Sequence, residues 1–190
     1  DGSVLISSDK NYIRKLDFGN GGGATVNGVA FDSVTTSGTG WALTGAGWVV
    51  PESASTGYTQ LMSDFYYNGN PSALSFTGLT TGAYYEAVIY TLIGHWTGRP
   101  QNATFSNNGT TEFTLSSIDP GNFGAVVYRF YAQGTNASIT MAPVKPDTFH
   151  WFGASLELVG NPIITVGDSG NYDFSGVISG GIGISKVGSG

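Results

Sequence analysis

The chain has 190 residues, a formal net charge of −6 at neutral pH, no cysteine and only two histidines. This length allows one sizeable hydrophobic core with a short appendage. Seven scattered basic residues form no basic stripe, which argues against nucleic acid and anionic membrane surfaces as partners. The lack of cysteine excludes disulfides, zinc thiolates and thiol nucleophiles.

The composition predicts an all-β protein. Glycine accounts for 30 residues, charged residues for 11% and aromatic residues for 13%. So many aromatic residues are not typical of a disordered chain, and helical periodicity is hard to find. No apolar run is long enough to cross a membrane, and the polar start does not resemble a signal peptide, so we expect no membrane insertion.

Short strands separated by glycine-rich breaks are predicted in the first part of the chain. They cover residues 4–6, 12–18, 24–31, 41–43 and 48–50. The polar residues 51–59 are predicted to form a loop. Trp41 and Trp48 flank a short glycine-rich turn, and we expect both to fill the hydrophobic core.

Three hairpins are predicted in the middle of the chain. Residues 75–90 turn at Thr81-Gly82, residues 102–115 at Asn107-Asn108-Gly109, and residues 125–141 at 133–135. Glu86 lies within the first hairpin and must face water or pair with a cation. We therefore expect one face of its strand to be the surface.

A final strand is predicted at residues 151–159. Alternation places Phe152, Ala154, Leu156 and Leu158 on one side and Trp151 on the other, where Trp151 can lie exposed. With the preceding strands this makes an antiparallel β-sandwich or jelly roll over residues 1–159. The composition changes at Asn161-Pro162, so residues 160–190 are predicted to be a linker and a short Gly-rich C-terminal β extension.

The end of the chain carries a first resemblance. The sequences SGVISG at 175–180 and KVGSG at 186–190 resemble the start of the autotransporter-associated β-strand repeat. The segment Ile182-Gly183-Ile184 is smaller than usual for that repeat. The resemblance, which covers residues 171–190, implies the first part of a parallel β-solenoid in a longer bacterial surface or secreted protein.

Residues 1–159 carry a second resemblance. The motifs LDFG at 16–19, VNGVAF at 26–31, LTTG at 79–82 and FGASLEL at 152–158 are similar to galactose-binding-like and malectin-like β-sandwich modules. These motifs are mostly structural. The resemblance implies a non-catalytic carbohydrate-binding domain outside the cell or on its surface.

Candidate ligand-binding residues follow from the chemistry of sugars. The apolar faces of sugars stack on Trp or Tyr, while polar side chains bind their hydroxyls. The loop between two predicted strands offers both kinds of group in His95, Trp96, Arg99 and Gln101. The alternative for this loop is that Trp96 caps the core and Arg99 makes a surface ion pair.

A second candidate group lies at residues 64–71. Tyr66 and Tyr67 face opposite ways if the segment is extended, and Asp64 and Asn68 can add polar contacts. Two further candidates are isolated aromatic residues, Tyr58 and Trp151.

The sequence predicts no cofactor, although a structural calcium ion is compatible with the second resemblance. Galactose-binding-like modules often hold such an ion, and turns around Asp9, Asp17 or Asp32 could supply oxygen ligands. No spacing resembles an EF-hand, so no metal ligand is assigned.

The leading hypothesis is a non-catalytic module that binds a neutral polysaccharide or glycan by aromatic stacking. One alternative is a structural or adhesive segment of a surface protein, in contact with other domains of a longer chain. A third hypothesis is a small polysaccharide lyase or hydrolase, but no Gly-x-Ser-x-Gly or His-Glu-x-x-His motif is present.

Overall fold

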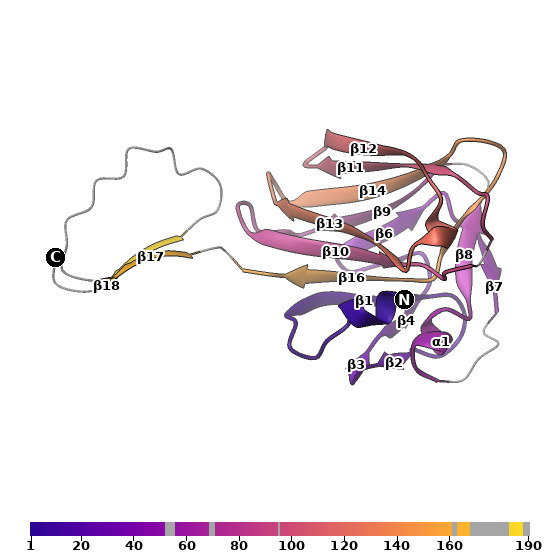
Figure 1. Cartoon of the computed structure of the whole chain (residues 1–190), viewed down its shortest axis with the longest axis horizontal. Coiled ribbons are helices and arrows are strands. Elements are labelled where there is room, and N and C mark those ends of the chain that lie inside the picture. Colours follow the sequence, from indigo (N-terminus) through magenta and orange to yellow (C-terminus); the bar gives the residue numbers. More distant parts are fainter. Residues whose placement is uncertain (52–55, 69–70, 95, 161–162, 168–182, 188–190) are drawn as a thin grey trace.

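The computed structural model describes residues 1–51, 56–68, 71–94, 96–160, 163–167 and 183–187. Most of its regular structure is β-strand, and the two largest sheets lie face to face as a sandwich (Figure 1). The predicted all-β sandwich is confirmed.

The first layer is a five-stranded sheet with the order β13-β10-β16-β1-β4. Its strands are β1 (Tyr12–Phe18), β4 (Asp32–Val34), β10 (Tyr84–Tyr90), β13 (Ala125–Tyr131) and β16 (Gly153–Leu158). All neighbours are antiparallel except β1 and β4, which are parallel.

The second layer is a six-stranded antiparallel sheet with the order β12-β11-β14-β9-β6-β5. Its strands are β5 (Ser37–Gly38), β6 (Trp41–Thr44), β9 (Ser72–Thr77), β11 (Gln101–Asn107), β12 (Thr110–Ile118) and β14 (Asn136–Pro143). Buried residues alternate with half-buried ones along β9, β11 and β14. This period of two shows that one face of the sheet covers the core and the other faces solvent.

The main core lies between the two layers. Both sheets contribute fully buried apolar side chains, among them Leu16, Ile89, Leu156, Leu74, Phe105 and Ile139. Each such side chain stabilises the fold by about 1.5–3 kcal/mol relative to exposure. The alternating apolar residues of the sequence therefore account for the packing of the layers.

A second core covers the outer face of the five-stranded sheet. Val88 and Tyr90 of β10 pack there against β2 (Thr25–Val26), β3 (Val29–Ala30) and the helix α1 (Gly57–Leu61). Strand β10 is consequently buried on both faces. The expectation that one face of this strand is the surface is wrong, because the segment before β4 and α1 fold over it.

Glu86 lies on this covered face, so its charge requires partners. Its carboxylate is 2.5 Å from Lys10 Nζ and 2.6 Å from Arg129 Nε. The predicted pairing of Glu86 is thus confirmed, although the residue is only 4% exposed.

A third sheet closes one end of the sandwich. Its order is β15-β8-β7, with β7 (Trp48–Val50), β8 (Phe65–Asn68) and β15 (Phe149–Trp151). Figure 1 shows β7 and β8 at this end. Trp151 belongs to the main core and Phe65 to the second, so the sheet joins the two.

Only one of the three predicted hairpins is confirmed. Strands β11 and β12 are joined by Asn108-Gly109, whose φ angles are 51° and 79°. Two positive φ angles are typical of a type I′ turn, for which Asn-Gly is the favoured sequence. The local sequence was therefore sufficient to predict this turn.

The other two predicted hairpins instead cross between the layers. Strand β9 lies in the six-stranded sheet and β10 in the five-stranded sheet, and β13 and β14 are divided in the same way. The same turn residues can connect two strands of one sheet or two facing sheets. Pairing of β9 with β14 and of β10 with β16 decides between them.

The final predicted strand is interrupted at Phe152. Residues on either side pair with different sheets, β15 with β8 and β16 with β1 and β10. The break shifts the alternation, so Trp151 lies in the same core as Ala154 and Leu156, while Phe152 joins the second core. Trp151 is therefore buried, and the expectation of an exposed indole is wrong.

Smaller elements also differ from the prediction. Residues 4–6 include the end of a 3₁₀ helix, η1 (Gly2–Leu5), and the predicted strand at 24–31 is the two short strands β2 and β3. Trp41 is buried as expected, but Trp48 is 68% exposed. Trp48 lies on β7, at the edge of the third sheet, where nothing in the described part of the chain covers its indole fully.

After the sandwich, β17 (Ile163–Gly167) and β18 (Gly183–Val187) pair in parallel as a sheet of their own. The predicted boundary at Asn161-Pro162 and most of the repeat-like stretch at 171–190 lie outside the described residues.

Candidate functional site

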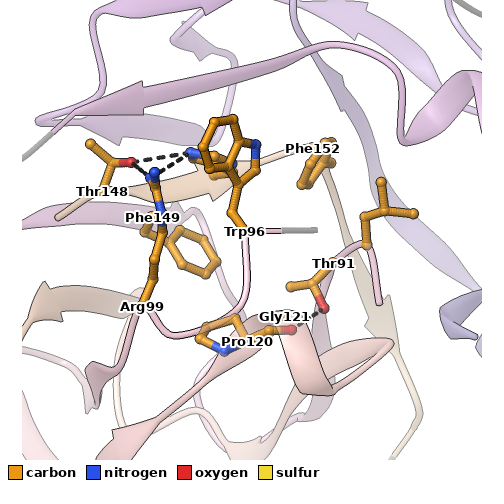
Figure 2. Close-up of a pocket in the computed structure, with 10 residues that line it drawn as sticks. Thr91, Trp96, Arg99, Pro120, Gly121, Thr148, Phe149 and Phe152 are labelled. Atoms are coloured by element: carbon orange, nitrogen blue, oxygen red, sulfur yellow. Dashed lines mark hydrogen bonds between the residues drawn. The ribbon is translucent and has the colours of Figure 1, made fainter. Parts of the chain in front are cut away.

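A pocket opens at the end of the sandwich that carries the third sheet (Figure 2). The β10–β11 connection contributes Trp96 and Arg99, the 3₁₀ helix η2 (Pro120–Asn122) contributes Pro120 and Gly121, and β15 contributes His150. The space between them is about 310 Å³, including open solvent at the mouth. It is a shallow, open site rather than an enclosed cavity.

The β10–β11 connection is held to η2 by several hydrogen bonds. The amide of Gly98 donates to the Asp119 carboxylate at 2.7 Å, and that of Gly94 donates to the Gly121 carbonyl at 2.7 Å. The hydroxyl of Thr91 donates to the carbonyl of Pro120 at 3.2 Å. These contacts bring together two segments distant in sequence and form one wall of the pocket.

Trp96 projects from this connection and is 52% exposed. Its φ of 53° lies in the left-handed region, which a bulky residue rarely adopts. The guanidinium carbon of Arg99 lies 4.3 Å from the centre of the indole, a cation–π contact. The indole thus has one face in contact with Arg99, while about half of its surface remains exposed to solvent.

Arg99 links the loop to the strand on the other side of the pocket. Its Nε is 3.0 Å from Asp147 Oδ1, and its Nη1 donates to Thr148 Oγ1 at 2.5 Å. Nη1 also lies 3.3 Å from His150 Nε2, which accepts because a guanidinium can only donate. The positive charge of Arg99 is therefore balanced within the site.

His150 lies at the centre of an aromatic group. Its ring stacks on Phe65 with a centroid distance of 4.3 Å and meets Trp96 edge-on at 5.7 Å. Tyr67 contacts the same ring at 5.8 Å. His150 thus connects the pocket loop with β8, although no sequence motif around it indicates a binding residue.

The structure brings together only part of the predicted binding set. Trp96 and Arg99 line the pocket, whereas His95 lies outside the described residues. Gln101 is fully buried in β11, and its side-chain amide donates a hydrogen bond from Nε2 to the backbone carbonyl of Arg99 at 3.3 Å. Gln101 therefore supports the loop from behind, with its side chain beneath the surface.

The second predicted group lies on and before β8. Tyr66 and Tyr67 do face opposite ways, because Tyr66 packs on the main core and Tyr67 on the second. Both are half-buried, as is Asn68. Asp64 is 3% exposed and accepts a hydrogen bond from the Gly21 amide at 2.9 Å, which is a structural role.

The two isolated candidates also have structural contacts. The Tyr58 hydroxyl donates to the Gly124 carbonyl at 3.3 Å, and burial raises the pKa of Tyr58 to about 12. Tyr58 lines a second open space beside α1, together with Met62 and Ile93. Trp151 donates from Nε1 to Ser72 Oγ at 2.8 Å inside the core.

Two features, a metal-binding cluster and a membrane-spanning helix, are absent from the described residues. No group of three or more His, Asp or Glu side chains is placed to hold a metal ion. Asp17, one of the aspartates suggested as a source of calcium ligands, accepts a hydrogen bond from the backbone amide of Ala24 at 2.8 Å. In the described part of the chain, no helix has the length and apolar character needed to cross a membrane.

Comparison with known proteins places the fold. No protein-family model matches the sequence, and no curated protein matches it at a significant level. The extracellular domain of ANXUR2 from Arabidopsis thaliana matches with a TM-score of 0.56 and 12% identity, over 77% of this chain and 48% of that chain. The ANXUR1 extracellular domain from the same plant gives 0.55 and 12%, over 77% and 48%.

A bacterial enzyme gives a weaker match. A calcium-binding mutant of Bacteroides uniformis β-glucuronidase 2 has a TM-score of 0.50 and 11% identity, over 81% of this chain and 19% of that chain. The chain thus spans about half the length of the plant domains and a fifth of the enzyme. These likenesses show that the chain shares a β-sandwich fold with these proteins and do not by themselves identify a ligand.

Proposed function

We propose that the chain is a non-catalytic carbohydrate-binding module that holds a neutral glycan in the pocket of Trp96 and Arg99. The observation that carries the proposal is the half-exposed indole of Trp96 beside polar groups from a different segment of the chain. An exposed indole can stack on the C–H face of a sugar, while Thr148 and Arg99 can bind its hydroxyls.

The electrostatics of the pocket favour an uncharged ligand. Asp147 balances the charge of Arg99 at 3.0 Å, and the whole chain has a net charge of −6. Arg99 Nη2 carries two further N–H donors that suit a hydroxyl oxygen. An anionic polymer would be repelled by the chain as a whole and would find no uncompensated cation in this pocket.

The residues that line the pocket support a binding role rather than catalysis. None of those described carries a carboxylate, whereas glycoside hydrolysis usually needs a pair of them across the bond. The nearby Asp119 and Asp147 are engaged, the first by the Gly98 amide and the second by Arg99. A non-enzymatic module is consistent with both observations.

The proposal includes an extracellular or cell-surface location, as a module of a larger secreted or surface bacterial protein. It is supported by the likeness to two plant extracellular domains, and the autotransporter-like stretch at 171–190 suggests the bacterial setting. The alternative, a structural or adhesive segment, is favoured by Asp64, Gln101 and Trp151, which hold the fold together instead of facing solvent.

The first test is a binding screen of the full chain on a glycan array and on insoluble neutral polysaccharides. We expect specific retention by at least one neutral glycan, with a loss of about tenfold or more in Trp96→Ala, because that change removes the stacking surface. Phe113→Ala is the matched control, since Phe113 is 43% exposed on β12, outside the pocket.

Both variants must unfold at nearly the same temperature as the unaltered chain, as expected for the substitution of an exposed residue. If the unaltered chain and Trp96→Ala were retained equally by the glycan, this pocket would be ruled out as the binding site. A folded chain that no neutral glycan retains would favour the structural or adhesive alternative.

A further inference from the structure

A row of aromatic side chains crosses the third sheet. Trp48 of β7 is paired in register with Tyr67 of β8, and Tyr67 is paired with His150 of β15. Directly opposite residues in antiparallel strands point to the same face of a sheet. Trp48, Tyr67 and His150 are therefore on one face, and we call them the aromatic row.

Only part of this face is covered by the protein. Val50 and Phe65 form the neighbouring pair on the same face and pack into the second core. Two residues along each strand, Tyr67 and His150 are half-buried, with Tyr67 still packed on the second core, whereas Trp48 is 68% exposed. An indole exposed to this extent buries little apolar surface and so contributes little to folding.

The aromatic row is continuous with the pocket. His150 lines the pocket and contacts Trp96 edge-on at 5.7 Å, and Tyr67 contacts the same ring at 5.8 Å. Trp48 and His150 are separated by two strand spacings, about 10 Å. From Trp96 to Trp48 the aromatic surface is thus longer than one sugar ring.

We infer that the aromatic row extends the pocket into a platform for a linear neutral glycan chain, with Trp96 and Trp48 as its two ends. The module then recognises several consecutive sugar units instead of one terminal sugar. This inference rests on the proposed function and specifies the class of glycan.

The chemistry of the platform favours a glycan over a protein partner. Successive sugar units present repeated apolar faces, which match aromatic side chains spaced along a line. Arg99 carries the only permanent charge on the platform, and Asp147 balances that charge. The other side chains of the platform are Trp48, Tyr67, His150 and Trp96. A neutral chain therefore meets no unpaired charge on these residues.

Titration calorimetry with oligosaccharide series tests the inference on the full chain. The probes are β-1,4-linked gluco-, manno- and xylo-oligosaccharides and β-1,3-linked gluco-oligosaccharides, each from the monosaccharide to the hexasaccharide. We expect the affinity to rise with chain length in at least one series. Trp48→Ala should abolish that rise, a loss of roughly two- to tenfold for the hexasaccharide, and leave the shortest ligand unaffected.

Two variants separate the inference from the proposed function. Trp96→Ala should weaken ligands of every length, and Phe113→Ala should weaken none. Equal affinity for short and long ligands, or an unchanged rise with length in Trp48→Ala, would overturn the platform while the binding function stands. Absence of binding by all the series would overturn the platform, and absence of retention on the glycan array as well would overturn the proposed function.

A final outcome concerns a second copy of the chain. Sedimentation of the unaltered chain and Trp48→Ala should show the same oligomeric state. A dimer that requires Trp48, combined with glycan binding that does not, would assign the exposed indole to a protein interface and overturn the inference.

Discussion

The four tryptophans show how the surroundings of a residue determine its role. Trp41 and Trp151 are 6% and 0% exposed and fill the main core, whereas Trp96 and Trp48 lie largely at the surface. Trp41 and Trp48 flank the same short turn, so sequence position alone does not separate a core residue from a surface one. Neighbouring strands decide, because β9 and the facing sheet cover Trp41 while Trp48 lies on an edge strand.

At the residue scale, Trp151→Phe tests the structural role of this indole. The change removes the hydrogen bond from Nε1 to Ser72 and leaves a buried hydroxyl without that partner. We expect the free energy of unfolding to fall by at least about 1–3 kcal/mol, with glycan retention unchanged. Denaturant unfolding and the retention assay measure the two effects.

Ser72→Ala is the companion variant, because it removes the other partner of the same bond. The combination of both changes should cost less than the sum of the two single changes, since the residues contact each other. Loss of glycan retention in folded Trp151→Phe would show that the core tryptophan has a role in the site that its burial does not predict.

At the scale of elements, Glu86 ties several strands together. Its carboxylate lies between Lys10, just before β1, and Arg129 of β13, and Lys10 also contacts Glu157 of β16 at 3.0 Å. Burial by itself raises the pKa of Glu86, but hydrogen bonds and charges from Lys10 and Arg129 outweigh it. The pKa of Glu86 is therefore lower than its usual value of 4.5.

This lowered pKa predicts a pH dependence of stability. A carboxyl group whose pKa is lower in the folded state stabilises the fold above its unfolded pKa, and the contribution is lost as the pH falls through the folded pKa. We expect the unaltered chain to lose stability as the pH falls below about 4.5. Glu86→Gln should lower the free energy of unfolding at neutral pH by about 1–3 kcal/mol and flatten this acid limb.

Denaturant unfolding at a series of pH values measures both effects. Asp32→Asn is the control, because Asp32 is exposed on β4 and should leave the profile unchanged. An acid limb in Glu86→Gln as steep as in the unaltered chain would show that other carboxyl groups produce it.

At the scale of the whole molecule, the sandwich and the C-terminal pair are separate in their strand pairing. Among the described strands, β17 and β18 pair only with each other, and β1 to β16 make their ladders within residues 1–160. We expect a chain that ends at Gly160 to keep the thermal unfolding midpoint of the sandwich. Calorimetry of the shortened and full chains, with limited proteolysis of the latter, checks this expectation.

A lower unfolding temperature for the shortened chain would mean that residues 161–190 dock on the sandwich and stabilise it. Rapid proteolytic loss of this segment, with no change in the unfolding midpoint, agrees with independent folding of residues 1–160.

Features that depend on local chemistry were predictable at all three scales. The strand at Tyr12–Phe18 and the Asn108-Gly109 turn follow from alternation and from residues that accept positive φ angles. Trp96 and Arg99 could also be selected from the sequence, because they combine stacking and hydrogen-bonding groups in one loop between strands. Local sequence is informative here because each feature involves only neighbouring residues.

The sequence by itself determined an all-β chain, the Asn108-Gly109 hairpin turn and one loop of the candidate site. Only the tertiary structure decided which sheet each strand joins, that Phe152 interrupts the last strand, and that His150 meets Trp96 and Tyr67. Strands β9 and β10 illustrate the reason, since a turn permits either a hairpin or a crossing. The free energy that selects between them comes from pairing and packing with residues distant in the chain.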